Sequence, residues 1–240
     1  NEYFRDGVQD DYITFSVGYK YQEYSYEHKY VKEVLNYFSS IQKDVKMRDY
    51  LIVLLSSYIS GHNKDQQFII WTGTGSNGKS KTLEFCKLAW GNYAGTLPIK
   101  ILTGKRANAG VANPEIADTK GKRLVVFQEP ENDDVIQVGY MKELSGSDPI
   151  CARKLFRDPF TFIPQFKMIL TCNKLPTIPS TDGGTWRRIR VSPFESEFID
   201  VDEKGNNANN GKPLSGKQSP KRFDFEEKMD NSDLALVPIA

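Results

Sequence analysis

Residues 68–82, FIIWTGTGSNGKSKT, combine an apolar run with a glycine-rich turn and a lysine-serine pair. Gly73, Gly78, Lys79 and Ser80 fit the spacing G-x-x-x-x-G-K-[ST]. In this pattern backbone N–H groups point at phosphate oxygens, the lysine reaches the β- and γ-phosphates and the hydroxyl binds Mg²⁺. We therefore predict a nucleotide site after a buried strand and at the start of a helix. Its predicted lining is Gly73, Thr74, Gly75, Ser76, Asn77, Gly78, Lys79, Ser80 and Lys81.

Acidic residues follow the next short apolar run, residues 123–127 (RLVVF). An acid at the carboxyl end of a buried strand can hold the water shell of Mg²⁺ or polarise the attacking water, and both roles need an anion beside the γ-phosphate. We predict that Glu129 has this role and that it forms the metal site together with Ser80. Glu131 is the alternative acid.

An asparagine follows a third apolar run, residues 166–171 (FKMILT). The amide of Asn173 can hydrogen-bond both the γ-phosphate and the attacking water without adding negative charge, so we predict a catalytic sensor. The alternative is a turn residue ahead of a proline. The segment Asn-Lys-Leu-Pro also resembles the guanine-reading N-K-x-D motif, but Pro176 has no side-chain acceptor for guanine, so we exclude guanine specificity.

Two adjacent arginines, Arg187 and Arg188, follow the turn Gly183-Gly184 and precede a further apolar stretch. A guanidinium can stabilise the charge on a transferring phosphoryl group and can be supplied by a neighbouring subunit. We predict that one of the pair acts in this way. The alternative is surface charge on an edge strand.

Residues 142–190 are locally basic, with nine lysines and arginines against four acids. Arg153 and Lys154 lie there beside Leu155 and Phe156. Basic groups neutralise backbone phosphates and aromatic rings contact sugars or bases, so this segment is predicted to form a hairpin that grips single-stranded DNA. A solvated charged face is the alternative.

Short apolar runs alternate with helical patterns along the chain. This alternation predicts an α/β fold with a mostly parallel sheet, which would position these residues. Apolar residues recur at helical spacing over residues 28–38 and 47–58, which predicts two amphipathic helices. We divide the chain into a helical region (1–62), a nucleotide domain (63–200) and a flexible polar segment with the start of a further region (201–240). Irregular structure is expected over 201–222.

Composition limits the function classes. The 240 residues carry a formal net charge of +1, so any surface for DNA must be local. The three cysteines are widely spaced, which predicts reduced intracellular thiols and no zinc site. No apolar run approaches the roughly 18 residues of a membrane span.

His28 and His62 are expected at the surface or in caps. For the four tyrosines Tyr19, Tyr21, Tyr24 and Tyr26, we expect core and packing roles more than base stacking. The first residue is not methionine, and we expect a piece of a longer protein.

Five segments in this order resemble the superfamily 3 helicases, with greatest similarity to the primase-helicases of poxviruses, giant viruses and phages: GTGSNGKS, VVFQEPE, LSGSDPICARKLF, MILTCNKLP and WRRIRVSPF. The resemblance covers about residues 28–200. It implies an AAA+-type ATPase with a preceding helical collar, ATP and Mg²⁺ as cofactors, and a hexameric ring around single-stranded or forked DNA. It also implies a primase region in the full-length chain and action at intracellular sites of viral DNA replication. The implied roles are phosphate and Mg²⁺ binding for Lys79 and Ser80, the Walker B acid for Glu129, the sensor for Asn173, the arginine finger for Arg187 or Arg188, and the DNA-gripping hairpin for Arg153 and Lys154.

One departure from the family concerns the acids. Many members carry two adjacent acids where this chain has Gln128 and Glu129, and Glu131 lies beyond a proline. The alternatives to a helicase motor are another DNA motor, such as a packaging or remodelling ATPase, and a nucleotide-gated DNA-binding module without productive hydrolysis. A nucleotide kinase is disfavoured, because no lid and acceptor-site pattern is present.

Overall fold

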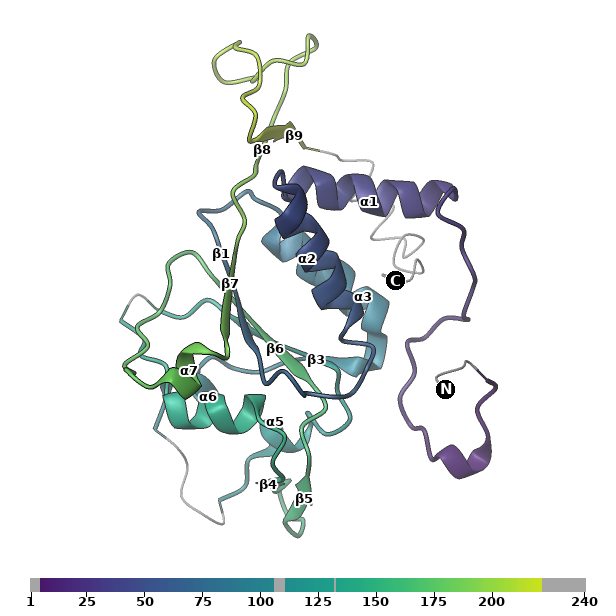
Figure 1. Ribbon diagram of the computed structural model, residues 1–240, viewed down its shortest axis with the longest axis vertical. Coiled ribbons are helices and arrows are strands. Elements are labelled where there is room, and N and C mark those ends of the chain that lie inside the picture. Colours follow the sequence, from purple (N-terminus) through teal and green to yellow (C-terminus); the bar gives the residue numbers. More distant parts are fainter. Residues whose placement is uncertain (1–4, 106–110, 132, 222–240) are drawn as a thin grey trace.

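The computed structural model describes residues 5–105, 111–131 and 133–221. At its centre lies a parallel five-stranded sheet in the order β2-β3-β6-β1-β7 (Figure 1). Its strands are β1 (Phe68–Thr72), β2 (Ala94–Thr96), β3 (Leu124–Gln128), β6 (Lys167–Cys172) and β7 (Ile189–Pro193). The predicted α/β fold with a parallel sheet is therefore confirmed.

Helices cover both faces of the sheet, which explains why its inner strands are apolar without alternation. One face packs against α1 (Lys29–Ile41), α2 (Val45–Ser56) and α3 (Lys79–Trp90); the other packs against α4 (Lys100–Thr103), α5 (Pro114–Ala117) and α6 (Val138–Ser145). Because side chains alternate along a strand, Ile69 and Trp71 of β1 enter the first core and Phe68 and Ile70 enter the second.

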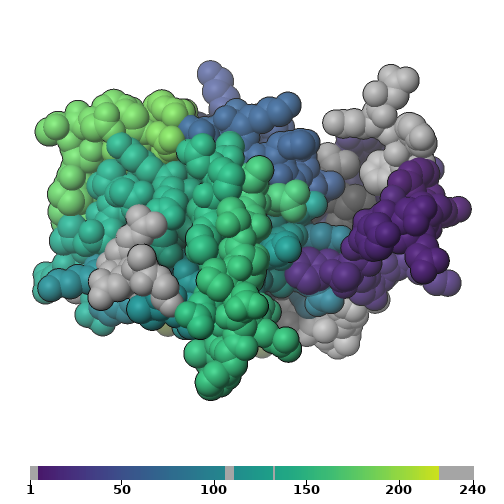
Figure 2. Space-filling model, turned by 90° about the horizontal axis from the view of Figure 1, so that it is seen from below, coloured from purple at the N-terminus to yellow at the C-terminus, as the bar shows by residue number. Residues whose placement is uncertain are grey.

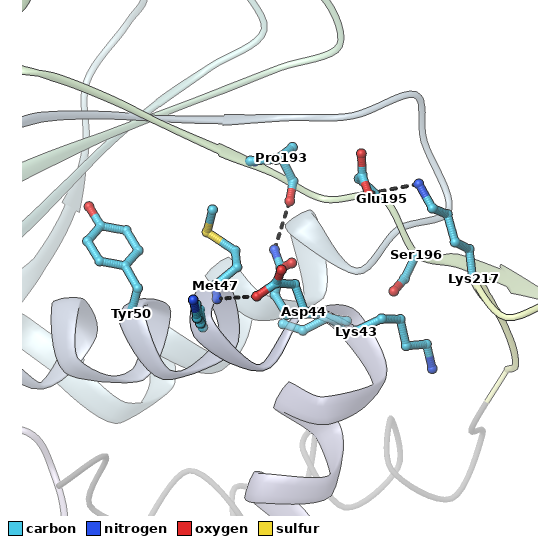
Figure 3. Close-up of a pocket in the computed structure, with 11 residues that line it drawn as sticks. Lys43, Asp44, Met47, Tyr50, Pro193, Glu195, Ser196 and Lys217 are labelled. Atoms are coloured by element: carbon cyan, nitrogen blue, oxygen red, sulfur yellow. Dashed lines mark hydrogen bonds and ion pairs between the residues drawn. The ribbon is translucent and has the colours of Figure 1, made fainter.

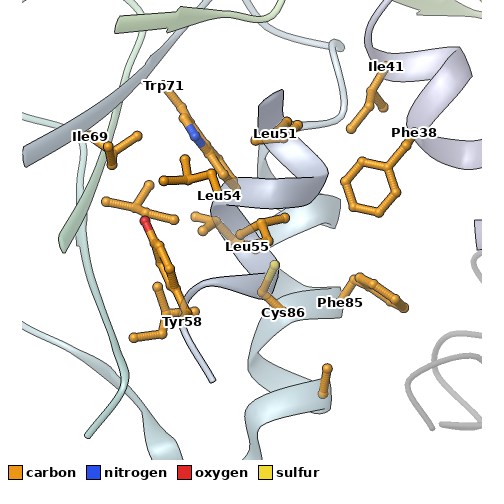
Figure 4. Packing of buried hydrophobic residues seen from close by; sticks show 14 of the residues in the cluster. Phe38, Ile41, Leu51, Leu54, Leu55, Tyr58, Ile69, Trp71, Phe85 and Cys86 are labelled. Carbon is orange, nitrogen blue, oxygen red and sulfur yellow. The ribbon is translucent and has the colours of Figure 1, made fainter. Parts of the chain in front are cut away.

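The first core joins the amino-terminal helices to the central sheet and α3. Figure 4 shows Trp71 of β1 beside Leu54 and Leu55 of α2, with Cys86 of α3 below them and Phe38 of α1 opposite. These side chains belong to one buried cluster. Burial raises the pKa of the Cys86 thiol, so this thiol stays protonated.

Helices α1 and α2 begin at residues that can cap them. The side chains of His28 and Asp44 accept hydrogen bonds from backbone N–H groups in the first turns of α1 and α2.

Residues 5–27 contain one short element, the 3₁₀ turn η1 (Gln9–Asp11), so the helical part of the predicted 1–62 region lies within 29–56 among the described residues. Two of the four tyrosines pack as expected: the Tyr19 hydroxyl donates to the carbonyl of Ala89 at 2.5 Å and the Tyr24 ring lies against His28. The expectation is wrong for Tyr21 and Tyr26, which are exposed. Both tyrosines precede Val34, the first buried residue of the described core, and lie in a segment that runs along the surface.

Regular structure continues after the sheet. β8 (Glu197–Ile199) pairs in parallel with β9 (Gln218–Pro220). Residues 201–217 form turns and irregular structure as expected, and β9 is the part of the 201–222 segment that differs from the expectation. Long-range contacts hold β9, since the Lys43 ammonium donates to the Ser219 hydroxyl at 2.8 Å and the Gln218 amide to Glu197 at 2.9 Å. The turns between β8 and β9 project at the top of Figure 1. Residues 222–240 lie outside the described residues.

Candidate active site

The glycine-rich loop connects the carboxyl end of β1 to the first turn of α3, in the strand-turn-helix context that the sequence predicts. Two glycines are required by close packing. A Cβ on Gly73 would lie 2.4 Å from the carbonyl oxygen of Phe194, and one on Gly78 would lie 2.6 Å from the side chain of Ile41. Gly78, at a φ of 87°, caps α3 in a left-handed conformation that favours glycine.

Lys79 opens α3 and is buried, with 7% of its surface exposed. Its ammonium donates to the carbonyl of Gly73, so the side chain folds back over the loop. Burial lowers the pKa of Lys79, and the nearby Cys172 and Glu129 counteract that effect. Ser80 follows it and is exposed at the helix start. A buried ammonium over a loop of backbone N–H groups is a ready site for an anion.

Contacts from behind fix the shape of the loop. The Asn77 amide donates to the Phe194 carbonyl at 3.3 Å, its side-chain oxygen accepts from the backbone of Lys79 at 3.3 Å, and the Ser76 carbonyl accepts from Phe198 at 2.6 Å. Tyr37 also supports the loop, since its hydroxyl donates a hydrogen bond to the Gly78 carbonyl at 3.2 Å. The sequence did not predict this role. No local signal marks this contact, because it joins α1 to the loop across 41 residues.

Glu129 and Asn173 lie at the same edge of the sheet as the glycine-rich loop. β6 lies between β1 and β3, and the register pairs Thr72 with Cys172 and Thr171 with Gln128, so the three strands end together. The backbone N–H of Glu129 donates to the carbonyl of Thr171 at 3.0 Å, which ties the acid to the neighbouring strand. A cavity of about 130 Å³ is lined by Glu129, Glu131 and Asn173.

The two acids differ in their surroundings. Glu129 is close enough to Lys79 to influence its pKa, and its own φ of 48° turns the chain sharply after β3. The carboxylate of Glu131 lies 3.9 Å from the ammonium of Lys100, and its backbone N–H donates to the carboxylate of Asp134. These contacts favour Glu129 over Glu131 as the acid that acts beside the loop.

A larger cavity of about 380 Å³ lies between the α1–α2 connection and the chain that follows β7 (Figure 3). It adjoins the loop, because Ile41 in its wall contacts Gly78 and Pro193 precedes Phe194, the partner of Asn77. Two hydroxyls at this cavity, those of Tyr50 and Ser196, are buried without a hydrogen-bond partner among the described residues.

Arg187 and Arg188 lie far from the loop of their own chain. They follow the short helix α7 (Gly183–Trp186) and precede β7, and the Phe68 N–H donates to the Arg188 carbonyl at 2.8 Å, at the amino end of β1. A five-residue strand is about 16 Å long, so the arginines and the loop lie at opposite edges of the sheet. The Gln66 side-chain oxygen accepts from Arg187 at 2.6 Å and from Arg188 at 2.8 Å.

The predicted hairpin is present. β4 (Ile150–Ala152) and β5 (Phe160–Phe162) pair antiparallel, and residues 153–159 form the tip. The hairpin is at the lower end of Figure 1, and the view from below in Figure 2 shows this green segment uncovered at the surface. Lys154 pairs with Asp118 at 2.6 Å, and the Arg153 guanidinium donates to the Arg157 carbonyl at 3.0 Å.

Within the described residues, no group of three or more histidine, cysteine or acidic side chains is arranged to hold a metal ion by itself. No helix in that part of the chain is long and apolar enough to cross a membrane.

The sequence is similar to viral proteins. It is 45% identical over 196 residues to "Putative helicase L207/L206" of Acanthamoeba polyphaga mimivirus, which covers 82% of this chain and 20% of that protein. It is 37% identical over 173 residues to "Putative helicase 022R" of Frog virus 3, covering 70% and 18%. It is 28% identical over 211 residues to "Putative primase C962R" of African swine fever virus (strain Badajoz 1971 Vero-adapted), covering 88% and 21%. The chain spans about a fifth of the length of these relatives.

DUF5906, described as a family of unknown function, matches residues 71–188. Among solved structures, the apo A form of the NrS-1 C-terminal region superimposes with a TM-score of 0.60 at 14% identity. The match covers 93% of this chain and 47% of that one. This likeness shows a shared fold.

Proposed function

We propose that this chain, which belongs with the viral relatives named as helicases and primases, is the ATP-driven motor part of a superfamily 3 DNA helicase. In this proposal ATP hydrolysis moves the protein along one DNA strand and separates the duplex. One observation carries most of the proposal: the glycine-rich loop, Glu129 and Asn173 end three adjacent parallel strands at one edge of the sheet. A phosphate-binding loop, an acid and a neutral amide are the groups that phosphoryl transfer to water requires.

The residues of the loop fit a nucleoside triphosphate. Lys79 is a buried ammonium whose hydrogen bond within the described residues is to the loop itself, so phosphate oxygens can supply the missing anion. The 380 Å³ cavity beside the loop has room for a nucleoside. We assign ATP to this site.

Mg²⁺ would be held by the hydroxyl of Ser80 and, directly or through water, by Glu129. When Mg²⁺ is bound together with phosphates, it keeps several water ligands and takes few ligands from the protein. The small number of acids at the site is consistent with this coordination. The ion would neutralise charge on the phosphates. Glu129 and Asn173 would orient the attacking water.

Glu129→Gln should retain ATP binding and lose hydrolysis, because the amide keeps the size of the side chain and removes the anion. We expect turnover to fall on the order of 10²-fold or more, as for the loss of other groups that stabilise a transition state. Single-turnover hydrolysis and fluorescent-nucleotide binding measure the two effects. Glu131→Gln is the matched control, and it should keep most activity. A greater loss in Glu131→Gln would assign the acid to Glu131.

In this proposal, ATP hydrolysis requires an arginine from a second subunit. The arginines at the opposite edge of the sheet cannot reach the phosphates of their own chain, but a neighbour in a ring can receive them. We therefore propose a homo-oligomer, a hexameric ring, with its sites between subunits. The primase activity, the viral replication context and an intracellular location of the full-length protein are parts of the same proposal, since the relatives are viral and about five times longer.

The hairpin residues Arg153 and Lys154 are proposed to grip single-stranded DNA. Changing both to alanine should weaken strand binding and make its salt dependence shallower, by about 0.7 in the slope of log K against log salt for each phosphate that the variant no longer neutralises. Basal ATPase without DNA should stay near normal. The control changes Lys204 and Lys212, which are exposed in the turns between β8 and β9, at the opposite end of the molecule in Figure 1. An unchanged slope in the hairpin variant would leave these residues as ordinary surface charge.

The decisive experiment for the function is unwinding of a forked duplex with ATP, run beside a size measurement of the same sample. Strand separation that depends on ATP and Mg²⁺ is the expected result. DNA-stimulated ATPase without strand separation would instead indicate a packaging or remodelling motor. DNA binding that responds to ATP without turnover would indicate a nucleotide-gated binding module.

A further inference from the structure

The hairpin tip holds an aromatic ring in full contact with solvent. Phe156 is 99% exposed, and its backbone adopts a left-handed conformation with a φ of 57°. This conformation is unfavourable for a bulky residue, and full exposure of the ring forgoes the stabilisation of burial. A side chain that gains nothing from the fold of its own chain, at a strained position, points to a role in binding.

The rest of the hairpin holds this ring in place. The side chain of Asn113 accepts from the backbone N–H of Arg153 at 2.7 Å, and the backbone N–H of Asn113 donates to the carbonyl of Arg153 at 2.9 Å, so the first residue of the tip is bound to the body of the domain. On the second strand, the Lys120 ammonium lies 5.2 Å from the centre of the Phe160 ring. The tip is thus presented on a fixed support.

The surroundings of Phe156 select the kind of partner. Three cations, Arg153, Lys154 and Arg157, and one acid, Asp158, lie within three residues of it, and the neighbouring Leu155 is 61% exposed. An apolar ring among cations suits a ligand that combines flat apolar faces with regular negative charge, and an unpaired nucleic acid strand has both. In a duplex the base faces are already stacked on each other, so only a single strand or an open fork offers them.

We propose that Phe156 stacks on an unpaired base of the bound DNA strand, while Arg153 and Lys154 contact its phosphates. This inference rests on the proposed function and adds to it a contact with base faces. Stacking would make the grip sensitive to the presence of bases but tolerant of their identity, because every base has a π-face.

Three variants on two strands test the inference. Phe156→Ala should reduce affinity for a single-stranded oligonucleotide by roughly 5- to 100-fold, the range expected for the loss of one stacked base. On an abasic strand of equal length, the variant and the native chain should bind alike. Phe156→Trp should restore binding to the normal strand, whereas Phe156→Leu, which is apolar but has no ring, should not.

Tyr12 provides the matched control. It is also an exposed aromatic residue, at 83%, with a positive φ of 50°, but it follows Asp10 and Asp11 instead of cations. Tyr12→Ala should leave DNA affinity unchanged. The slope of affinity against salt should also stay unchanged in Phe156→Ala, in contrast to the arginine and lysine variant of the hairpin.

The outcomes separate the inference from the function on which it rests. If the native chain binds and unwinds DNA but Phe156→Ala does so equally well, stacking is wrong and the helicase proposal stands. An equal loss on normal and abasic strands would also overturn stacking, since it would indicate a contact with the backbone. If the native chain binds no single strand at all, both proposals fail together.

Discussion

Lys79→Ala is expected to abolish ATP hydrolysis and duplex unwinding while the chain stays folded. The side chain ends in an ammonium that bonds the loop carbonyl of Gly73, and the hydrophobic cores do not use it. Its removal takes away the charge proposed to meet the β- and γ-phosphates. The expected loss of turnover is on the order of 10²-fold or more.

The measurements are steady-state ATPase and fork unwinding, with thermal unfolding to verify the fold. Lys87→Ala is the matched control, because Lys87 lies in the last turn of the same helix and its substitution removes an equal charge. This control should keep full activity. Retained turnover in Lys79→Ala with a normal unfolding midpoint would overturn the assignment of the phosphate loop.

The sequence predicted the strands of the site better than their arrangement. The apolar runs at 123–127 and 166–171 correspond to β3 and β6 within one residue, and the apolar run that opens residues 68–82 forms β1. Fully buried parallel strands need apolar residues on both faces, which makes such runs recognisable. The insertion of β6 between β1 and β3 could not be predicted from the runs themselves. It depends on pairing between segments about 40 to 100 residues apart, and this order determines that Asn173 ends beside the loop.

The contacts that support the loop were also beyond local patterns. Tyr37 belongs to an ordinary amphipathic helix, and nothing in its neighbours indicates that its hydroxyl reaches Gly78. The same holds for β9, where a polar sequence forms a strand through contacts with Lys43 and Glu197. The hairpin was predictable as a basic segment, but the full exposure of Phe156 at its tip required the structure.

The position of the two arginines makes their division of labour testable. Arg188 is half-buried and donates to both Gln66, at 2.8 Å, and the Gly184 carbonyl, at 2.6 Å. Burial lowers its pKa, with a further lowering from the charge of Arg187. Arg187 is exposed and donates to Gln66 at 2.6 Å. We therefore expect Arg188 to support the fold and Arg187 to reach a neighbouring subunit.

Each arginine should give a distinct result when it is changed alone. Arg188→Ala should lower the free energy of unfolding by about 1 to 3 kcal/mol, because it breaks two hydrogen bonds to a charged group. Arg187→Ala should leave stability nearly unchanged and reduce turnover by about 10³-fold or more, the contribution of an arginine finger. Arg190→Ala is the control: this exposed guanidinium donates to the carbonyls of Arg187 and Ile189 in its own chain, so turnover should persist.

Mixing two inactive variants tests whether Arg187 acts between subunits. In a mixture of Arg187→Ala and Lys79→Ala chains, some interfaces combine an intact Lys79 from the first chain with an intact Arg187 from the second. ATPase should therefore return in part, although each variant alone is inactive. As the mixing ratio changes, the recovered ATPase activity should be proportional to the fraction of interfaces that combine an intact Lys79 with an intact Arg187. It should therefore be highest at intermediate ratios. If labelled subunits are shown to mix and activity stays absent at every ratio, Arg187 does not complete a neighbour's site, and the ring with shared sites loses the observation on which it rests.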